Sequence, residues 1–250
     1  EMPLDFYHYY PLKECDDTMR KFEKKFPEFV KVSIMGRSLE GRDILVATVT
    51  NFGKGDPAKK PAMYMDGNIH GNEVQGSEVC IYTLWYLLYH YGKEEFITDL
   101  LDNCVFYIAP VVNPDARVAF FEEPNSPHSP RRNFRPFDND GDGLVDEDGA
   151  DDIDGDGSIT RMRRKSKYGR RVAGESADTM RSRRIDEQGE YEYLGSEGID
   201  NDKDGRVNED DKGGVDLNRN FPSAWEPRNG AYPMSCLLYT SDAADELLGV

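Results

Sequence analysis

The sequence has no apolar run that approaches the ~20 residues needed for a membrane-spanning helix. Basic residues are also few, because 31 Lys and Arg stand against 48 Asp and Glu and leave a formal net charge of −17. Like charges repel on approach, so this balance argues against a nucleic acid or an anionic membrane as a partner. The chain begins at Glu1 with neither a starting Met nor a signal-like segment. We expect a secreted or periplasmic protein whose natural N-terminus is missing or was processed.

Cysteine is scarce as well, and the four cysteines show no C-x-x-C spacing. This spacing argues against a structural zinc knuckle and against a dithiol redox site. We expect Cys15, Cys80 and Cys104 to be small, buried apolar side chains. With 38% hydrophobic residues in a mass of 28.4 kDa, the chain is large enough for one α/β domain with a core.

Hydrophobic periodicity divides the first half of the chain into helices and strands. Apolar residues at helical spacing predict helices at residues 12–26 and 74–91. Short apolar runs predict strands at residues 30–34, 44–49, 63–66 and 104–112. Alternating strands and helices indicate an α/β fold, a mixed central sheet with helices on both faces.

An imidazole and a carboxylate follow the predicted strand at 63–66, where His70 and Glu73 form an H-x-x-E motif. Sites in α/β folds gather at the carboxyl ends of strands, which is where this motif falls. Zinc accepts imidazole nitrogen and carboxylate oxygen, and a catalytic zinc needs three protein ligands with a fourth position left for water. The motif alone is a weak signal, because ordinary polar turns also carry a His and a Glu at this spacing.

Three D-x-D-x-D-G repeats lie between about residues 121 and 214, where the chain becomes strongly acidic. In EF-hand-type loops, oxygens at positions 1, 3 and 5 converge on calcium, and Gly at position 6 permits the sharp turn. Only the third repeat has an acid at position 12, so we predict calcium binding without helix-flanked EF-hand geometry. The predicted ligands are Asp138, Asp140, Asp142, Asp152, Asp154, Asp156, Asp200, Asp202, Asp204 and Asp211. The alternative is a solvated acidic linker.

A basic stretch at residues 161–171 lies between the second and third repeats. Such a stretch could bind nucleic acid, but nearby carboxylates can neutralise it locally. We therefore expect a folded insertion with internal ion pairs and no nucleic-acid partner.

Further motifs occur along the chain in a definite order. They are Tyr10-Pro11, the turn at residues 36–42, the H-x-x-E motif, Asn113-Pro114-Asp115-Ala116-Arg117 and the segment 216–222. Together these motifs resemble the zinc metallocarboxypeptidases of the carboxypeptidase A and E type. The resemblance covers residues 7–121, a short piece near Arg161, and residues 214 to about 235.

The resemblance implies a division of the chain into four parts. Residues 1–121 and 214–235 would form an incomplete carboxypeptidase domain, and residues 122–213 would be an acidic insertion. Residues 236–250 do not resemble the family, and we suspect a non-native tail.

The family's activity would be the zinc-dependent removal of C-terminal residues from peptides or proteins. By this resemblance, His70 and Glu73 would be zinc ligands. Asp216 would accept the other ring N–H of the histidine, which fixes the tautomer of the metal-binding ring.

The resemblance also implies a grip on the substrate's terminal carboxylate by Asn218 and Arg219. Arginine can meet a carboxylate through two parallel N–H bonds, which lysine cannot reproduce. An arginine that stabilises the oxyanion would lie in the run at residues 161–165, where two registers select either Arg163 or Arg164.

Three functional groups of the family are not identifiable in this sequence. They are the third zinc ligand, a histidine downstream of the Asn-Arg pair, then a tyrosine and the glutamate general base; no histidine follows His128. We therefore expect the chain to be truncated at its C-terminus and inactive as given. Two alternatives stay open: a non-catalytic, calcium-stabilised binding protein, and an amidase or deacylase on the same fold.

Overall fold

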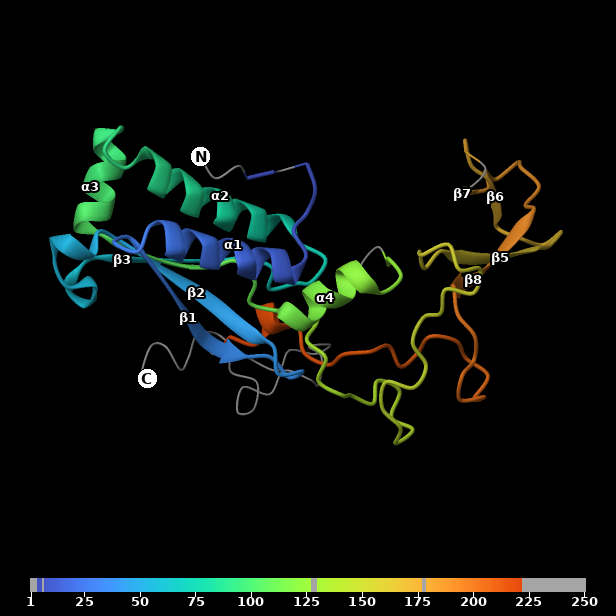
Figure 1. Ribbon diagram of the computed structural model, residues 1–250. Coiled ribbons are helices and arrows are strands. Elements are labelled where there is room, and N and C mark those ends of the chain that lie inside the picture. Colours follow the sequence, from blue (N-terminus) through green and yellow to red (C-terminus); the bar gives the residue numbers. More distant parts are fainter. Residues whose placement is uncertain (1–3, 6, 127–129, 177–178, 222–250) are drawn as a thin grey trace. The chain divides into compact units, whose positions relative to one another are not determined.

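The computed structural model describes residues 4–5, 7–126, 130–176 and 179–221. The chain divides into two compact units (Figure 1). The core unit comprises residues 1–123, 128–135 and 213–250, and the loop unit comprises residues 124–127 and 136–212. No helix within the described ranges is long and apolar enough to cross a membrane.

A four-stranded mixed sheet forms the centre of the core unit. Its strands are β1 (Val30–Arg37), β2 (Asp43–Val49), β3 (Ala62–Asp66) and β4 (Val105–Ala109), in the order β1-β2-β4-β3. Strand β2 pairs antiparallel with both β1 and β4, whereas β3 and β4 are parallel. Residues on both faces of β2 are buried, which explains its nearly continuous apolar sequence. The predicted α/β fold with a mixed sheet is confirmed.

The described residues of the core unit form four α-helices. They are α1 (Leu12–Lys25), α2 (Gln75–His90), α3 (Glu95–Asn103) and α4 (Pro114–Glu122), with short 3-10 helices η1 (Phe52–Lys54) and η2 (Pro57–Lys59) before β3. Helices α1 and α2 lie side by side along the sheet (Figure 1). Phe22 of α1 and Leu84 of α2 are fully buried in the same apolar cluster as Val49 of β2. The opposite face of the sheet carries a smaller cluster around Val46 and Val112.

The three described cysteines of the core unit pack among apolar side chains. Cys15 and Cys80 are buried, and this burial raises the pKa of each thiol to about 12. Cys104 is only partly buried.

The loop unit contains a second, smaller antiparallel sheet. Its strands are β5 (Arg161–Lys165), β6 (Arg171–Ala173), β7 (Met180–Ser182) and β8 (Tyr191–Ser196), in the order β5-β8-β6-β7. Ion pairs form within it, as the sequence predicted: Arg164 lies 2.8 Å from Glu192, and Arg181 lies 2.6 Å from Glu187.

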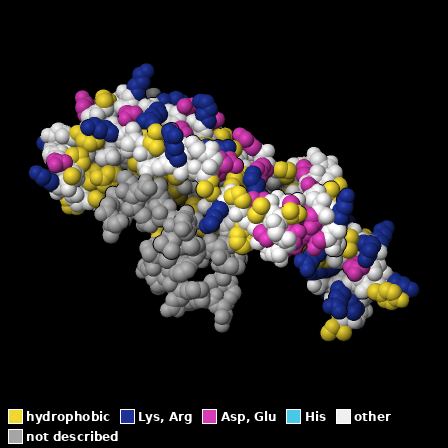
Figure 2. Space-filling view, turned by 90° about the horizontal axis from the view of Figure 1, so that it is seen from below, with side chains coloured by type: hydrophobic (Ala, Val, Ile, Leu, Met, Phe, Trp, Pro, Cys, Tyr) yellow, Lys and Arg dark blue, Asp and Glu magenta, His cyan; other side chains and the backbone are white. Residues whose placement is uncertain are grey.

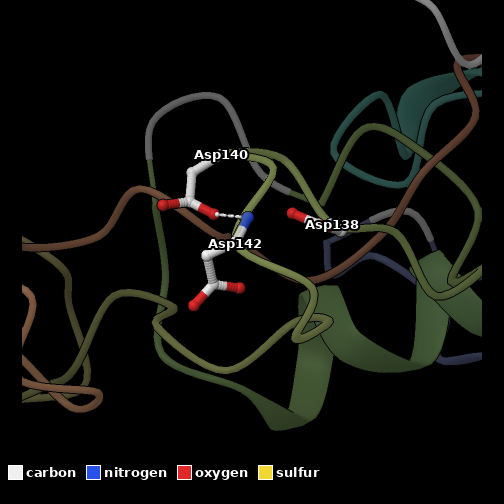
Figure 3. Close-up of side chains that lie close together, drawn as sticks. All are labelled: Asp138, Asp140 and Asp142. Carbon is white, nitrogen blue, oxygen red and sulfur yellow. Dashed lines mark hydrogen bonds between the residues drawn. The ribbon is translucent and has the colours of Figure 1, made fainter.

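The three acidic repeats fold into three loops with one shared geometry; we call residues 138–149 loop 1, residues 152–163 loop 2 and residues 200–211 loop 3. In each loop the carboxylate at position 1 accepts the N–H of Gly at position 6, at 3.0, 2.8 and 3.1 Å. The carboxylate at position 3 accepts the N–H of position 5, at 3.0, 3.1 and 2.9 Å; Figure 3 shows this bond from Asp142 to Asp140 in loop 1.

Glycine is required at position 6 of each loop. The backbone φ angles there are 101°, 84° and 98°, in the left-handed region that other residues rarely adopt. The repeated sequence pattern therefore produces a repeated fold, in which the aspartates are turned inward by backbone hydrogen bonds.

Candidate metal centre

His70 lies in the turn that follows β3 and is only 2% exposed. Its Nε2 lies 3.0 Å from Asp216 Oδ1, which accepts a hydrogen bond there. Its Nδ1 lies 3.0 Å from Glu73 Oε2 but outside hydrogen-bonding geometry, so this buried nitrogen has no hydrogen-bond partner among the described residues. The proton on Nε2 leaves the Nδ1 lone pair facing a carboxylate, and this donor set fits a zinc ion.

Asp216 connects the histidine to the substrate-binding segment proposed from the sequence. Its Oδ1 accepts the backbone N–H of Asn218 at 3.0 Å and thereby caps η3 (Leu217–Arg219). Burial acts to raise the pKa of Asp216, but the hydrogen bond from His70 and the charge of Arg131 outweigh it and hold that pKa below its usual value. The carboxylate therefore stays ionised beside the ring that it orients.

Arg131 is a residue of this centre that the sequence analysis missed. Its Nε donates to Asp216 Oδ2 at 3.1 Å, and its Nη1 donates to Glu73 Oε1 at 3.3 Å. The side chain is partly exposed, so the guanidinium is held beside the two acids and still open to solvent. Its only sequence signal is a basic residue at the start of an acidic segment, which does not reveal the contact.

Asn68 holds the turn that carries His70. Its side-chain amide donates to the carbonyl oxygens of His70 and Gly71, at 2.7 and 3.1 Å. Its own backbone is in the left-handed region, with φ 58°. Arg117 is fully buried and donates to Asn68 Oδ1 at 2.8 Å, so the turn is fixed from the interior of the fold.

Gly71 has a separate steric reason to be glycine. A Cβ on this residue would lie 2.5 Å from the Cβ of Ala116 in α4, which no side chain tolerates. The close approach of the turn to α4 therefore depends on glycine at this position of the H-x-x-E motif.

The structure brings together His70, Glu73 and Asp216, although 146 positions separate the first from the last. Asn218 and Arg219 lie within η3, which begins directly after Asp216, and both are exposed. Of the other histidines, His8 contacts Asp5 and Glu14, and His90 contacts Glu94. His128 lies outside the described residues.

Arg163 and Arg164, the two candidates for the oxyanion arginine, belong to β5 of the loop unit. The guanidinium of Arg163 lies over the ring of Tyr191, 4.5 Å from its centroid. Arg164 forms the ion pair with Glu192. A role for either residue at the oxyanion stays a prediction.

Ligand-type oxygens gather in the acidic loops, and Figure 2 shows Asp and Glu side chains collected over this part of the loop unit. The carboxylates of Asp138, Asp140 and Asp142 lie within 4.8 Å of one another, as do those of Asp200, Asp202 and Asp204. In loop 2 the corresponding group consists of Asp152, Asp154 and Glu197. Asp156 and Asp211 are in none of these groups.

Glu197 follows β8 and is another residue that the sequence analysis missed. It is 5% exposed, and its carboxylate accepts four hydrogen bonds from loop 2, the shortest from Ile153 N and Thr160 Oγ1 at 2.9 Å. The hydrogen bonds from Thr160 in particular lower the pKa of this carboxyl. An acid distant in sequence thus contributes to loop 2, which has Arg163 at position 12.

Comparisons with known proteins identify the family. A family model described as zinc carboxypeptidase matches residues 15–150. Human carboxypeptidase D is 32% identical over 114 residues, which cover 45% of this chain and 8% of that protein. The inactive metallocarboxypeptidase ECM14 of Ajellomyces dermatitidis is 32% identical over 117 residues, which cover 47% of this chain and 20% of that protein. The matched region is therefore a small part of these relatives.

Among solved structures, carboxypeptidase A from Helicoverpa armigera is similar over 53% of this chain and 30% of its own, with 28% identity and a TM-score of 0.46. Thrombin activatable fibrinolysis inhibitor is similar over 58% of this chain and 35% of its own, with 26% identity and a TM-score of 0.47. Because the family model matches more than half of its residues, the chain belongs to the zinc carboxypeptidase family.

Proposed function

We propose that the protein is a zinc-dependent metallocarboxypeptidase that removes C-terminal residues from peptides or proteins. The observation that carries this proposal is the buried imidazole of His70, whose Nε2 is held by Asp216 while Nδ1 faces Glu73 at 3.0 Å without a hydrogen bond. A histidine used only for packing would have both ring nitrogens satisfied.

In this function, His70 and Glu73 would hold zinc, which supplies Lewis-acid activation of the scissile carbonyl and of a water nucleophile. Asp216 keeps the imidazole in the tautomer that leaves Nδ1 free. Arg219 would bind the substrate's terminal carboxylate through paired N–H groups, with Asn218 as an additional donor.

Arg131 is a further candidate for stabilising negative charge on the substrate carbonyl. Its guanidinium is fixed by Glu73 and Asp216, so it would act without reorganisation. Arg131 is therefore a third arginine to test in this role, in addition to the candidates Arg163 and Arg164. The proposed reaction also requires a third zinc ligand and a general base, and we expect the 250-residue chain alone to be inactive without them.

Zinc uptake tests the metal centre. Equilibrium dialysis should show that His70→Ala lowers zinc affinity of the chain by at least about tenfold, whereas His90→Ala, which removes a histidine paired with Glu94, should not. Equal zinc uptake by wild type and His70→Ala would refute the assignment of this ligand.

A substrate pair tests the reaction class on the protein encoded by the complete gene. A carboxypeptidase should shorten a peptide with a free C-terminus and leave the same peptide with a C-terminal amide intact. Arg219→Ala should mainly raise KM for the free acid. Cleavage of a non-peptide amide that is insensitive to the free carboxylate would favour an amidase or deacylase, and no turnover of either class would favour a binding protein.

We also propose that the three acidic loops bind calcium. The proposal is supported by their common backbone geometry, by the inward-facing carboxylates and by the contribution of Glu197 to loop 2. Isothermal titration should show calcium uptake, and Asp152→Asn should reduce it. The absence of both calcium uptake and a calcium-dependent thermal shift would refute this proposal.

A further inference from the structure

The N-P-D-A-R motif forms the cap and the first turn of α4. Its buried Asp115 accepts from Arg42 Nη1 at 2.7 Å, in the turn between β1 and β2. Its buried Arg117 donates from Nε to the carbonyl oxygen of Tyr10 at 3.0 Å. Two polar residues of the motif therefore hold other segments of the core unit in place, and the third, Asn113, has different partners.

Asn113 is 3% exposed, and both polar atoms of its side chain are hydrogen-bonded. Its Oδ1 caps α4 by accepting a backbone N–H at 3.4 Å. Its Nδ2 donates to the carbonyl oxygens of Ile69, at 3.1 Å, and Arg132, at 3.3 Å. Ile69 directly precedes His70, and Arg132 directly follows Arg131. One amide thus joins α4 to the segment that carries a proposed zinc ligand and to the segment that carries the arginine beside it.

Three consecutive carbonyl groups at the start of the His70 turn are held by two buried amides. Asn113 donates to the carbonyl oxygen of Ile69, and Asn68 donates to those of the next two residues. Asn68 belongs to the turn itself, whereas Asn113 belongs to the cap of α4. Asn68 therefore fixes the shape of the turn, and Asn113 fixes where the turn lies against the helix.

The backbone on both sides of Arg131 is hydrogen-bonded to the same part of the core unit. The carbonyl oxygen of Pro130 accepts the N–H of Asn72, which lies within the H-x-x-E motif, at 2.8 Å. The carbonyl oxygen of Arg132 accepts from Asn113. The guanidinium of Arg131 therefore reaches Glu73 and Asp216 from a backbone that is held on both sides.

We infer that Asn113 is a positioning residue of the zinc centre, which holds His70 and Arg131 at a fixed separation through the peptide groups next to them. This inference rests on the proposed zinc-dependent function. A guanidinium stabilises developing negative charge without reorganisation only when it is already in place, and a misplacement of about 1 Å can cost about 100-fold in rate. Loss of the Asn113 amide should weaken zinc binding and slow the chemical step, and it should leave Asn218 and Arg219 on η3 unchanged.

Two matched serine substitutions separate this positioning from helix capping. Serine caps helices about as well as asparagine, but its hydroxyl is one bond shorter, so Asn113→Ser should keep the cap of α4 and lose both carbonyl contacts. We expect zinc affinity of the chain to fall at least about tenfold by equilibrium dialysis. Asn51→Ser is the control, because Asn51 caps η1 and its amide donates to Tyr91 and Asp102. The control should lower stability in urea and leave zinc affinity unchanged.

Amide hydrogen exchange of the metal-free chain gives a measurement that does not depend on zinc. Asn113→Ser should speed exchange in peptides that cover residues 69–73 and 130–132, because both segments lose their contact with α4. Asn51→Ser should leave exchange in these peptides unchanged.

Steady-state kinetics of the protein encoded by the complete gene, measured at saturating zinc, test the placement of Arg131. Asn113→Ser should lower kcat at least about tenfold and keep KM within about twofold, because the residues proposed to bind the terminal carboxylate are not moved. Arg219→Ala should show the opposite pattern and mainly raise KM. An unchanged kcat in Asn113→Ser would overturn the inference.

The outcomes separate this inference from the proposed function. If wild type binds zinc and Asn113→Ser binds it equally well, the inference is wrong and the proposed function stands. If Asn51→Ser weakens zinc binding as much as Asn113→Ser does, the effect is one of stability and the inference is also overturned. If wild type binds no zinc, both fail. Should Asn113→Ser not fold, Asn113→Asp decides by the same criteria, because it keeps the capping oxygen and replaces the donor with an acceptor.

Discussion

Different forces stabilise the inside of the core unit and the inside of the loop unit. In the core unit, helices α1 and α2 bury a continuous apolar cluster against the sheet. Among the described residues of the loop unit, only Ile159 and Val172 are buried apolar side chains. Its loops are closed by aspartates that accept backbone N–H groups. The hydrophobic effect needs no ion, whereas gathered carboxylates repel one another, so the loop unit should depend on cations and the core unit should not.

The largest expected effect is in the core unit, at its buried cation. Arg117→Met should destabilise this unit by about 3–5 kcal/mol, because Glu78, the carbonyl oxygen of Tyr10 and the side-chain oxygens of Asn68 and Ser77 lose a charged donor inside the fold. Amide hydrogen exchange measured peptide by peptide should show the loss over the core unit. Arg37→Met, which removes an exposed pair with Asp43, should cost under about 1 kcal/mol. A comparable loss in both variants would contradict the role of burial.

The second largest expected effect is that calcium stabilises the loop unit and leaves the stability of the core unit unchanged. At 100 times its dissociation constant, calcium should stabilise the state that binds it by about 2.7 kcal/mol. Hydrogen exchange should slow over residues 136–212 and stay unchanged over α1 and α2. Equal slowing over both units would show that the core unit also depends on the ion.

A smaller effect concerns zinc in the core unit. Asn68→Gly keeps the left-handed backbone accessible but removes the amide that fixes the carbonyls of His70 and Gly71. We expect zinc affinity to fall about 10- to 100-fold by dialysis, as for other residues that orient a metal ligand. Asn103→Gly, which removes an amide that donates to a carbonyl of α3, should leave zinc affinity unchanged. Unchanged affinity in Asn68→Gly would mean that the turn holds its shape unaided.

The smallest expected effect is a pH dependence of the core unit. Burial raises the pKa of Asp16 to about 6, above the ~3.9 of an exposed Asp. The folded state therefore binds more protons than the unfolded state between about pH 4 and 6, and stability falls as pH rises through this window. After allowance for partial exposure, wild type should lose about 1 kcal/mol more than Asp16→Asn from pH 4 to 7 in urea unfolding.

The neighbouring Asp17 provides a control of opposite sign. The hydrogen bond from Lys13 lowers the pKa of Asp17, so its contribution should be lost only as pH falls below about 4. The Asp17→Asn variant should therefore lose the same stability as wild type between pH 4 and 7. If Asp17→Asn removes that loss and Asp16→Asn does not, the assignment of the titrating group is wrong.

Several features of the molecule could be predicted from the sequence. Helical periodicity located α1 and α2 to within about one residue at each end, because their packing on a sheet requires an apolar face. The H-x-x-E motif was correctly placed after a strand. The shared geometry of the three loops follows from aspartate and glycine at fixed positions, since those hydrogen bonds are local.

The tertiary structure alone decided which distant side chains meet. Arg131 contacts Asp216 across 85 positions, and Glu197 reaches loop 2 from beyond β8. Hydrogen bonds between loops 1 and 3 join residues that are 53 to 71 positions apart in the sequence. Local spacing determines turns, helices and the type of ligand a residue can be, because these depend on neighbours in the chain. Long-range contacts depend on which distant segments the tertiary fold brings together. The sequence around an isolated charged residue does not indicate its partner.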